Sequence, residues 1–316
     1  MIGGSATVLA PATIGNVGVG LDVLGLAIER PGDRVTATTR KRQSAEEPCA
    51  RLVEVTGEPG TEPLPPCSAS NTACIAAESV LRLANIDAVV ELSLHKGLPV
   101  GSGLGSSAAS SAAAAQATNL ALGSMLSQQQ LLGACLDAEK AVSGAHADNI
   151  APALLGGLVL VRRAEPLDVL RIPIPDGLHL AIVCPVLQIL TRDARAVLEP
   201  TVPLQTAIHH SANVAAFVAA CYSGDLDALG RCIEDPLAEP ARIHMIPGGA
   251  EALTAMRAAG ALGASLSGSG PTLFALCRSR ESAGDAAVAG VDALAGAGVE
   301  ASPFLSHADC PGARQL

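Results

Sequence analysis

The stretch that decides the fold is residues 99–109, which have the sequence PVGSGLGSSAA. Three glycines and three serines stand here at the start of an Ala- and Ser-rich run, residues 106–122, that has the strongest helix propensity in the chain. Glycine lets a backbone turn with positive φ, and the N–H groups at a helix N-terminus bind anions. A hydroxyl in the first helical turn can also ligate Mg²⁺. The stretch predicts a phosphate-binding loop; the alternative is a flexible turn capped by Ser106.

Two common nucleotide-binding motifs do not describe this loop. A Walker A loop ends in Gly-Lys-Ser/Thr, and no such triplet occurs here. A Rossmann fingerprint requires an acidic ribose partner on the next strand, which the pattern does not supply. Other parts of the chain must therefore show which family of nucleotide-binding proteins this loop resembles.

Outward from the loop, the 316 residues predict roughly two domains. Alternating apolar residues predict strands before it at 5–11, 23–28, 34–39, 52–55 and 88–94, with a turn at Pro31–Asp33. Helical spacing predicts helices at 71–83, 106–122, 127–142, 192–198, 204–222, 226–233, 249–259 and 282–295. Further strands are expected at 158–161, 178–184, 263–266, 272–277 and 299–305, and the charged, Pro-containing stretch 162–175 is the expected domain junction. Strands and helices mix without strict alternation, which favours two α+β domains.

The composition of the chain indicates which kinds of molecule it can bind. The formal charge of −10 and the isoelectric point near 5.1 argue against a nucleic-acid or anionic-membrane binder, since both need a dense basic surface. No apolar run reaches the roughly 20 residues that span a bilayer, and no signal peptide is evident at the start. The nine cysteines form no Cys-x-x-Cys pair, which fits a reducing cytoplasm. We expect a cytoplasmic protein with a small-molecule substrate, whose Leu- and Ala-rich surface is compatible with a homodimer.

Three motifs, in the expected order along the chain, resemble the sequence signatures of one protein family. Residues 99–109 resemble the second signature of the GHMP kinases, residues 11–22 (PATIGNVGVGLD) resemble the first, and residues 267–272 (SGSGPT) resemble the third. The resemblance covers nearly the whole chain. It implies the two-domain α+β GHMP kinase fold, with an N-terminal mixed α/β nucleotide-binding domain at 1–164 and a C-terminal ferredoxin-like α+β domain at 165–316.

Within the GHMP kinases, four further segments are similar to the homoserine kinase family. They are residues 16–25, in which Leu21 replaces the usual Phe; residues 143–152 (SGAHADNIAP) followed by Gly156-Gly157; Thr191 with Arg195; and residues 239–248. This resemblance implies ATP-dependent phosphorylation of the L-homoserine hydroxyl to O-phospho-L-homoserine, on the pathway to threonine.

The resemblance also implies roles for individual residues. The nucleotide ATP is expected at Asn71, Lys96, Pro99, Gly101, Ser102, Gly103, Leu104, Gly105, Ser106 and Ser107, with Mg²⁺ at Ser107 and Glu139. L-Homoserine is expected at Asn16, Asp22, His146, Asn149, Arg195 and Arg242. Catalysis is assigned to Asn149, Glu139, Ser107, Lys96 and Thr191, with no carboxylate base.

Residue chemistry agrees with this substrate and leaves two alternatives open. A zwitterionic amino acid needs cations for its carboxylate, which Arg195 and Arg242 can supply, and an anion for its ammonium, for which Asp22 is suited. A GHMP kinase for another alcohol, such as mevalonate or shikimate, would leave Asp22 unexplained. A catalytically silent member that senses nucleotide or amino acid is the other alternative, against which the presence of Ser107, Glu139 and Asn149 argues.

Overall fold

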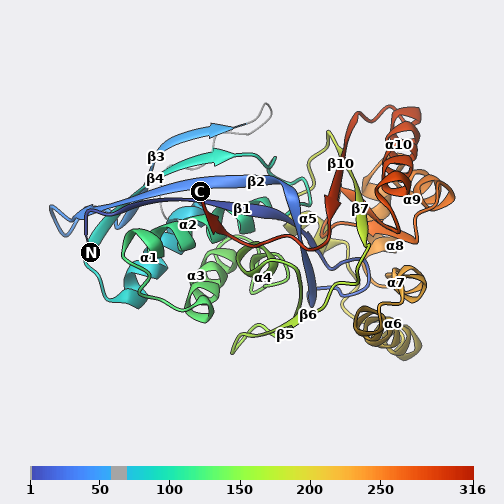
Figure 1. The fold of residues 1–316 in the computed structure, drawn as a ribbon, viewed down its shortest axis with the longest axis horizontal. Helices are drawn as coiled ribbons and strands as arrows, with labels where there is room; N and C mark the ends of the chain where they lie inside the picture. Colours follow the sequence, from blue (N-terminus) through green and yellow to red (C-terminus); the bar gives the residue numbers. More distant parts are fainter. Residues whose placement is uncertain (1, 58–69) are drawn as a thin grey trace.

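A computed structural model describes residues 2–57 and 70–316, arranged as two sheets with their helices (Figure 1). The seven-stranded sheet has the order β11-β1-β2-β4-β3, with β5 paired to β2 and β6 paired to β5. Its strands are β1 (Ser5–Gly15), β2 (Leu24–Lys41), β3 (Ala50–Gly57), β4 (Ala88–Lys96), β5 (Leu158–Arg163), β6 (Asp168–Ile172) and β11 (Arg314–Gln315). The second, antiparallel sheet has the order β10-β7-β9-β8. It contains β7 (His179–Pro185), β8 (Gly263–Leu266), β9 (Leu273–Cys277) and β10 (Ala301–His307).

Four helices cover one face of the large sheet: α1 (Thr72–Ala84), α2 (Ser106–Ala121), α3 (Gln128–Lys140) and α4 (Ile150–Leu155). Helix α2 lies at their centre, in contact with β1 and β2 of the sheet and with α1, α3 and α4 around it. Thirteen of its sixteen residues are buried, and its alanines let the neighbouring elements approach closely. A helix that is buried on all sides belongs to the core, so the loop that precedes it is held on a rigid element.

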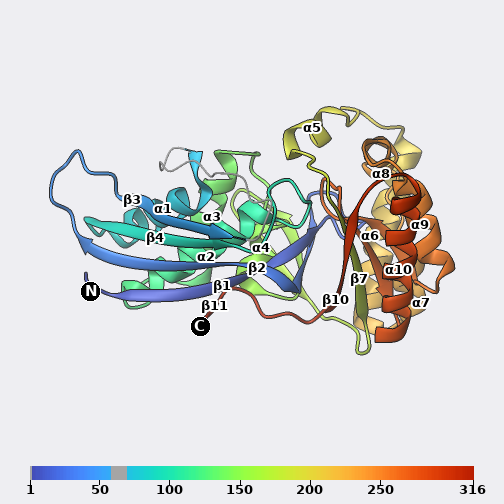
Figure 2. The same cartoon turned by 90° about the horizontal axis from the view of Figure 1, so that it is seen from above.

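The remaining helices lie around the second sheet (Figure 2). They are α6 (Leu204–Ser223), α7 (Leu226–Cys232), α8 (Glu239–Arg242), α9 (Gly249–Ala258) and α10 (Arg280–Gly296). Helices α9 and α10 share a core with one face of this sheet, whereas α6 and α7 share the core of the large sheet together with the other face. The short helix α5 (Thr191–Ala196) stands apart from these helices, above the junction of the two halves. The predicted two-part α+β architecture is confirmed.

The structure corrects several boundaries. Strand β1 continues to Gly15. The turn predicted at Pro31–Asp33 is instead part of the single strand β2. The β1–β2 register jumps there from the pair Pro11–Gly32 to the pair Ala12–Ile28, which marks a β-bulge. This bulge absorbs the residues that resemble a turn. Helix α4 was not predicted. The part of the chain at 58–69, including Cys67, lies outside the described residues.

The large sheet also extends past the predicted boundary at residue 164. Strand β6 pairs with β5 inside the stretch predicted to be a junction, and β11 at the end of the chain returns to pair with β1. The change from the first sheet to the second therefore falls between Ile172 and His179. Among the described helices, none is both long and apolar enough to cross a bilayer.

Candidate active site

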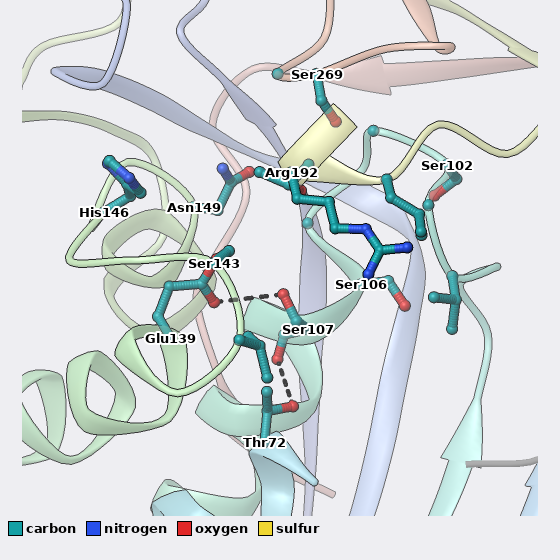
Figure 3. Close-up of a pocket in the computed structure, with 18 of the residues that line it drawn as sticks. Thr72, Ser102, Ser106, Ser107, Glu139, Ser143, His146, Asn149, Arg192 and Ser269 are labelled. Carbon is teal, nitrogen blue, oxygen red and sulfur yellow. Dashed lines mark hydrogen bonds between the residues drawn. The ribbon is translucent and has the colours of Figure 1, made fainter. Parts of the chain in front are cut away.

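A cavity of about 410 Å³ opens where the loops of the three sequence motifs meet. Its walls come from the loop before α2, from α3 and the segment after it, and from α5 and α8 of the second half (Figure 3). The predicted residues that line it are Asn16, Asp22, Asn71, Lys96, Gly101, Ser102, Gly103, Gly105, Ser106, Ser107, Glu139, His146, Asn149, Thr191, Arg195 and Arg242. Two of the predicted residues, Pro99 and Leu104, do not line it.

The glycine loop has the geometry that an anion site needs. Gly101, Gly103 and Gly105 all have positive φ, and Gly105 is the N-cap of α2 with φ of 66°. The first N–H groups of a helix have no intrahelical acceptor, and among the described residues no side chain caps this one. Gly105, Ser106 and Ser107 line the cavity, so the positive end of the helix dipole lies at the cavity wall.

The other two motifs hold this loop in place. The backbone N–H of Thr13 donates to Leu104 O at 3.0 Å, and Ser267 Oγ donates to Gly103 O at 2.7 Å. Leu104 is completely buried, so its side chain anchors the loop through packing, and its carbonyl accepts the bond from Thr13. A Cβ on Gly105 would overlap Thr13 Oγ1, which explains why glycine is required there.

Ser107 of α2 and Glu139 of α3 lie next to each other in the cavity wall (Figure 3). Ser107 Oγ donates to Glu139 Oε2 at 3.3 Å, and Ser143 Oγ donates to Glu139 Oε1. Burial raises the pKa of Glu139, although these two hydroxyls partly offset the effect. A buried carboxylate beside a hydroxyl is a donor set suited to Mg²⁺, which would restore its charge.

No three His, Cys, Asp or Glu side chains converge on a metal-binding geometry within residues 2–57 and 70–316. A divalent cation at Ser107 and Glu139 would therefore take most of its other ligands from water and from nucleotide oxygens. This pattern is usual for Mg²⁺ in kinases.

Lys96 lines the cavity, and its ammonium is bound by protein groups. Its side chain is only 2% exposed and forms an ion pair with the completely buried Asp33. Its Nζ also donates to Ser106 Oγ at 2.7 Å and Ser110 Oγ at 3.0 Å. Because its charge and its N–H groups are satisfied by protein groups in this structure, contact between Lys96 and the phosphoryl oxygens stays a prediction.

Asp22, Arg195 and His146 form a charged cluster on the opposite wall. Arg195 donates from both terminal nitrogens to the Asp22 carboxylate, at 2.7 and 3.1 Å, and His146 Nδ1 lies 3.6 Å from Asp22 Oδ1. Burial opposes ionisation of Asp22, but the hydrogen bonds and charge of Arg195 outweigh it, so the pKa of Asp22 is lowered. Burial lowers the pKa of His146, which favours its neutral form.

Arg242 and Asn16 complete this wall. Arg242 is 3% exposed; its Nε donates to Ala194 O at 3.0 Å, and its Nη1 donates to Gly268 O at 3.1 Å. Asn16 donates to the same Gly268 carbonyl at 3.2 Å. These bonds join α5, α8 and the third motif, and they leave part of the Arg242 guanidinium facing the cavity.

Asn149 is held at both ends of its amide. Thr13 Oγ1 donates to Asn149 Oδ1 at 2.8 Å, and Asn149 Nδ2 donates to Asp148 Oδ2 at 3.2 Å. Burial, together with the nearby negative charges of Asp22 and Glu139, raises the pKa of Asp148 to about 7. Sequence reasoning missed Thr13 and Asp148 as site residues, although both lie inside the quoted motifs.

Three further predicted residues, Thr191, Asn71 and Ser102, also line the cavity. Thr191 lies at the start of α5, and its neighbour Arg192, which was not predicted, extends over the cavity near Ser106 (Figure 3). Asn71 caps α1 through its side-chain oxygen, which accepts from Ala73 N at 3.0 Å. Ser102 is buried; its carbonyl accepts from Thr272, so it supports the loop through its backbone.

The fold and this site define an ATP-dependent small-molecule kinase of the GHMP class. Family models for the N-terminal and C-terminal domains of GHMP kinases match residues 71–157 and 217–293. Homoserine kinases from Chlorobium phaeobacteroides (strain BS1) and Arabidopsis thaliana are 40% and 43% identical to this chain. Each alignment covers 88% of this chain, together with 88% and 75% of the respective relative.

Solved structures agree with these relatives. A crystal structure of homoserine kinase from Cytophaga hutchinsonii superposes with a TM-score of 0.91 at 37% identity, and the match covers 99% of this chain and 97% of that one. Mevalonate kinase from L. major, at 18% identity and a TM-score of 0.69, shares the fold alone. The chain belongs to the homoserine kinase family of the GHMP kinases.

Proposed function

We propose that this protein transfers the γ-phosphoryl group of ATP to the side-chain hydroxyl of L-homoserine, giving O-phospho-L-homoserine for threonine biosynthesis. The observation that carries the proposal is the ion pair between Asp22 and Arg195, with Arg242 beside it, in the wall that faces the glycine loop. Family membership supports the same substrate.

The charges of this wall are complementary to a zwitterion. Without substrate, Asp22 and Arg195 neutralise each other at 2.7 Å. An amino acid offers an ammonium to Asp22 and a carboxylate to Arg195 and Arg242, so that the partly buried charges of Asp22 and Arg195 exchange one partner for another. A substrate with a carboxylate alone, such as mevalonate or shikimate, would leave Asp22 without a cation, which is costly inside a protein.

The opposite wall suits MgATP. The glycine loop and the first turn of α2 offer N–H groups to the phosphates, and Ser107 with Glu139 would hold the metal ion. When bound, Mg²⁺ neutralises negative charge on the phosphates. The chain has three Phe, one Tyr and no Trp, so the adenine must be held mainly by aliphatic packing and polar contacts.

Phosphoryl transfer requires positioning and charge stabilisation more than covalent help. Asn149 is the residue best placed to orient the acceptor hydroxyl. Thr13 and Asp148 fix its amide plane and leave one N–H and one lone pair of that amide for the substrate. Thr191 is the next polar group on the same side of the cavity.

A coupled ADP-release assay with L-homoserine, mevalonate and shikimate in parallel tests the proposal. We expect turnover of L-homoserine at least a hundredfold faster than of the two other alcohols. Faster turnover of mevalonate or shikimate would identify a kinase for a different alcohol. Retained ATP binding with no turnover would identify a silent sensor. A homodimer and a cytoplasmic location stay predictions from the sequence.

A further inference from the structure

A buried ion pair lies directly beneath the phosphate loop. The β2–β4 register pairs Arg34 with His95, which places Asp33 opposite Lys96 on the neighbouring strand. Asp33 is completely buried, and Lys96 is 2% exposed. Removing two charges from water is expensive, and a buried pair often gives no net gain in stability over apolar residues. The position of this pair therefore calls for a reason other than stability.

The ammonium of Lys96 has no donor left for a ligand. Its Nζ carries three protons and has four acceptors within hydrogen-bonding distance. The acceptors are Asp33 Oδ2, Ser106 Oγ at 2.7 Å, Ser110 Oγ at 3.0 Å and Ser106 O at 3.1 Å. A phosphate oxygen could bind Lys96 only by displacing one of these partners.

The same network reaches both ends of the phosphate loop. At the beginning of the loop, the N–H of Gly97 donates to Asp33 Oδ1 at 3.1 Å, and Leu98 O accepts from Ser106 Oγ at 3.1 Å. At its end, Ser110 Oγ donates to Asp33 Oδ2 at 2.6 Å. The pair thus joins the strand that enters the loop to the first two turns of the helix that leaves it.

We propose that Asp33 and Lys96 are positioning residues that fix the two ends of the phosphate loop. They hold the N-terminus of α2, and with it the Ser107 hydroxyl, in the orientation that receives the nucleotide. The inference rests on the proposed function only in taking ATP as the ligand of this loop.

A double-mutant cycle tests this role. The variants are Lys96→Met, Asp33→Asn and the double variant, with Asp227→Asn/Arg278→Gln as the control, since Asp227 and Arg278 form an exposed ion pair outside the cavity. Thermal unfolding and calorimetric binding of MgATP are measured without any acceptor alcohol. The KM for ATP and the KM for L-homoserine are then measured separately.

Each single variant should have a lower Tm, because it leaves one buried charge unpaired. The double variant has no unpaired charge, so its Tm should recover towards wild type, but it lacks the bonds from Lys96 Nζ to Ser106 and Ser110 and should still bind ATP at least tenfold more weakly. The KM for L-homoserine should stay unchanged, and the control should behave like wild type. Even if the single variants do not fold, the double variant decides the question. If it folds and binds ATP within threefold of wild type, or does not fold at all, the inference is overturned. Because Tm and calorimetric ATP binding need no phosphate acceptor, these two readouts stand even if L-homoserine proves not to be the substrate.

Discussion

Replacing Gly105 with alanine should damage the site through two separate effects. Gly105 has φ of 66°, and an L-residue in this left-handed conformation costs roughly 1–2 kcal/mol. The new Cβ would also overlap Thr13 Oγ1 and lie 3.1 Å from Asn149 Oδ1, which would break the hydrogen bond between these two side chains. Loss of that bond adds roughly 0.5–1.5 kcal/mol. The total of roughly 1.5–3.5 kcal/mol corresponds to a fall in Tm of roughly 2–5 °C in a chain of this size.

The effect on turnover should exceed the effect on stability, because the displaced group is the amide proposed to orient the acceptor hydroxyl. A displacement of about 1 Å in a positioned group can reduce the rate by about a hundredfold. The measurement is kcat for L-homoserine at saturating MgATP, together with Tm from scanning calorimetry. Gly123→Ala is the matched control, since Gly123 has φ of 90° and no described atom lies within 4 Å of the place that a Cβ would take. It should lower Tm and leave kcat unchanged. If Gly105→Ala keeps kcat within threefold of wild type, our account of the contact between Gly105, Thr13 and Asn149 is wrong.

Three further substitutions test other parts of the site. Glu139→Gln removes the anionic partner proposed for Mg²⁺, so kcat should fall by orders of magnitude; a value within about threefold of wild type at saturating Mg²⁺ would refute the assignment. Arg242→Ala should reduce kcat/KM for L-homoserine about ten- to a hundredfold, as expected for loss of a charge-assisted hydrogen bond, with little change in the KM for ATP. Homoserinol, which lacks the carboxylate, should be affected far less, and equal losses for both substrates would place the Arg242 guanidinium elsewhere. Asp148→Asn tests the raised pKa of Asp148. Because the folded-state pKa of about 7 exceeds the ordinary 3.8, the native state binds more protons than the unfolded chain between these two pH values. The stability that the carboxyl contributes therefore falls as the pH rises from about 4 to 7. The Tm of Asp148→Asn relative to wild type should therefore rise over this range in calorimetric scans, and a difference that is constant with pH would contradict the raised pKa.

The phosphate loop was predictable because its determinants are local. Three glycines placed at the start of a helix fix both the backbone conformation and the direction of the helix dipole. The two Gly-containing motifs that pack on the loop were predictable as motifs, and the structure shows the hydrogen bonds that join them, such as Ser267 Oγ to Gly103 O. The resemblance to a family placed Asp22 and Arg195 at the same substrate, but their ion pair joins residues 173 positions apart and was not predicted.

The residues that were missed owe their properties to distant parts of the chain. Asp33 lies in a Pro-Gly-Asp sequence that is typical of an exposed turn, but the bulge between β1 and β2 keeps it inside a continuous strand opposite Lys96. For the same reason the ion pair of Lys96 was not predicted, since its partner lies 63 residues away. Asp148 stands between two residues that were predicted, and its raised pKa follows from burial and from the charges of Asp22 and Glu139. No local pattern reports these long-range effects.

The most direct test of the central claim is to identify the product by ³¹P nuclear magnetic resonance. The protein is incubated with ATP, Mg²⁺ and L-homoserine, and L-2-aminobutyrate, which lacks the hydroxyl, replaces L-homoserine in the control. We predict a new phosphomonoester signal split by two methylene protons, formed in a 1:1 ratio with ADP and absent from the control. ADP formation that yields only inorganic phosphate, or no ADP above the control, would contradict the assignment of this cavity as a site for phosphorylating the homoserine hydroxyl.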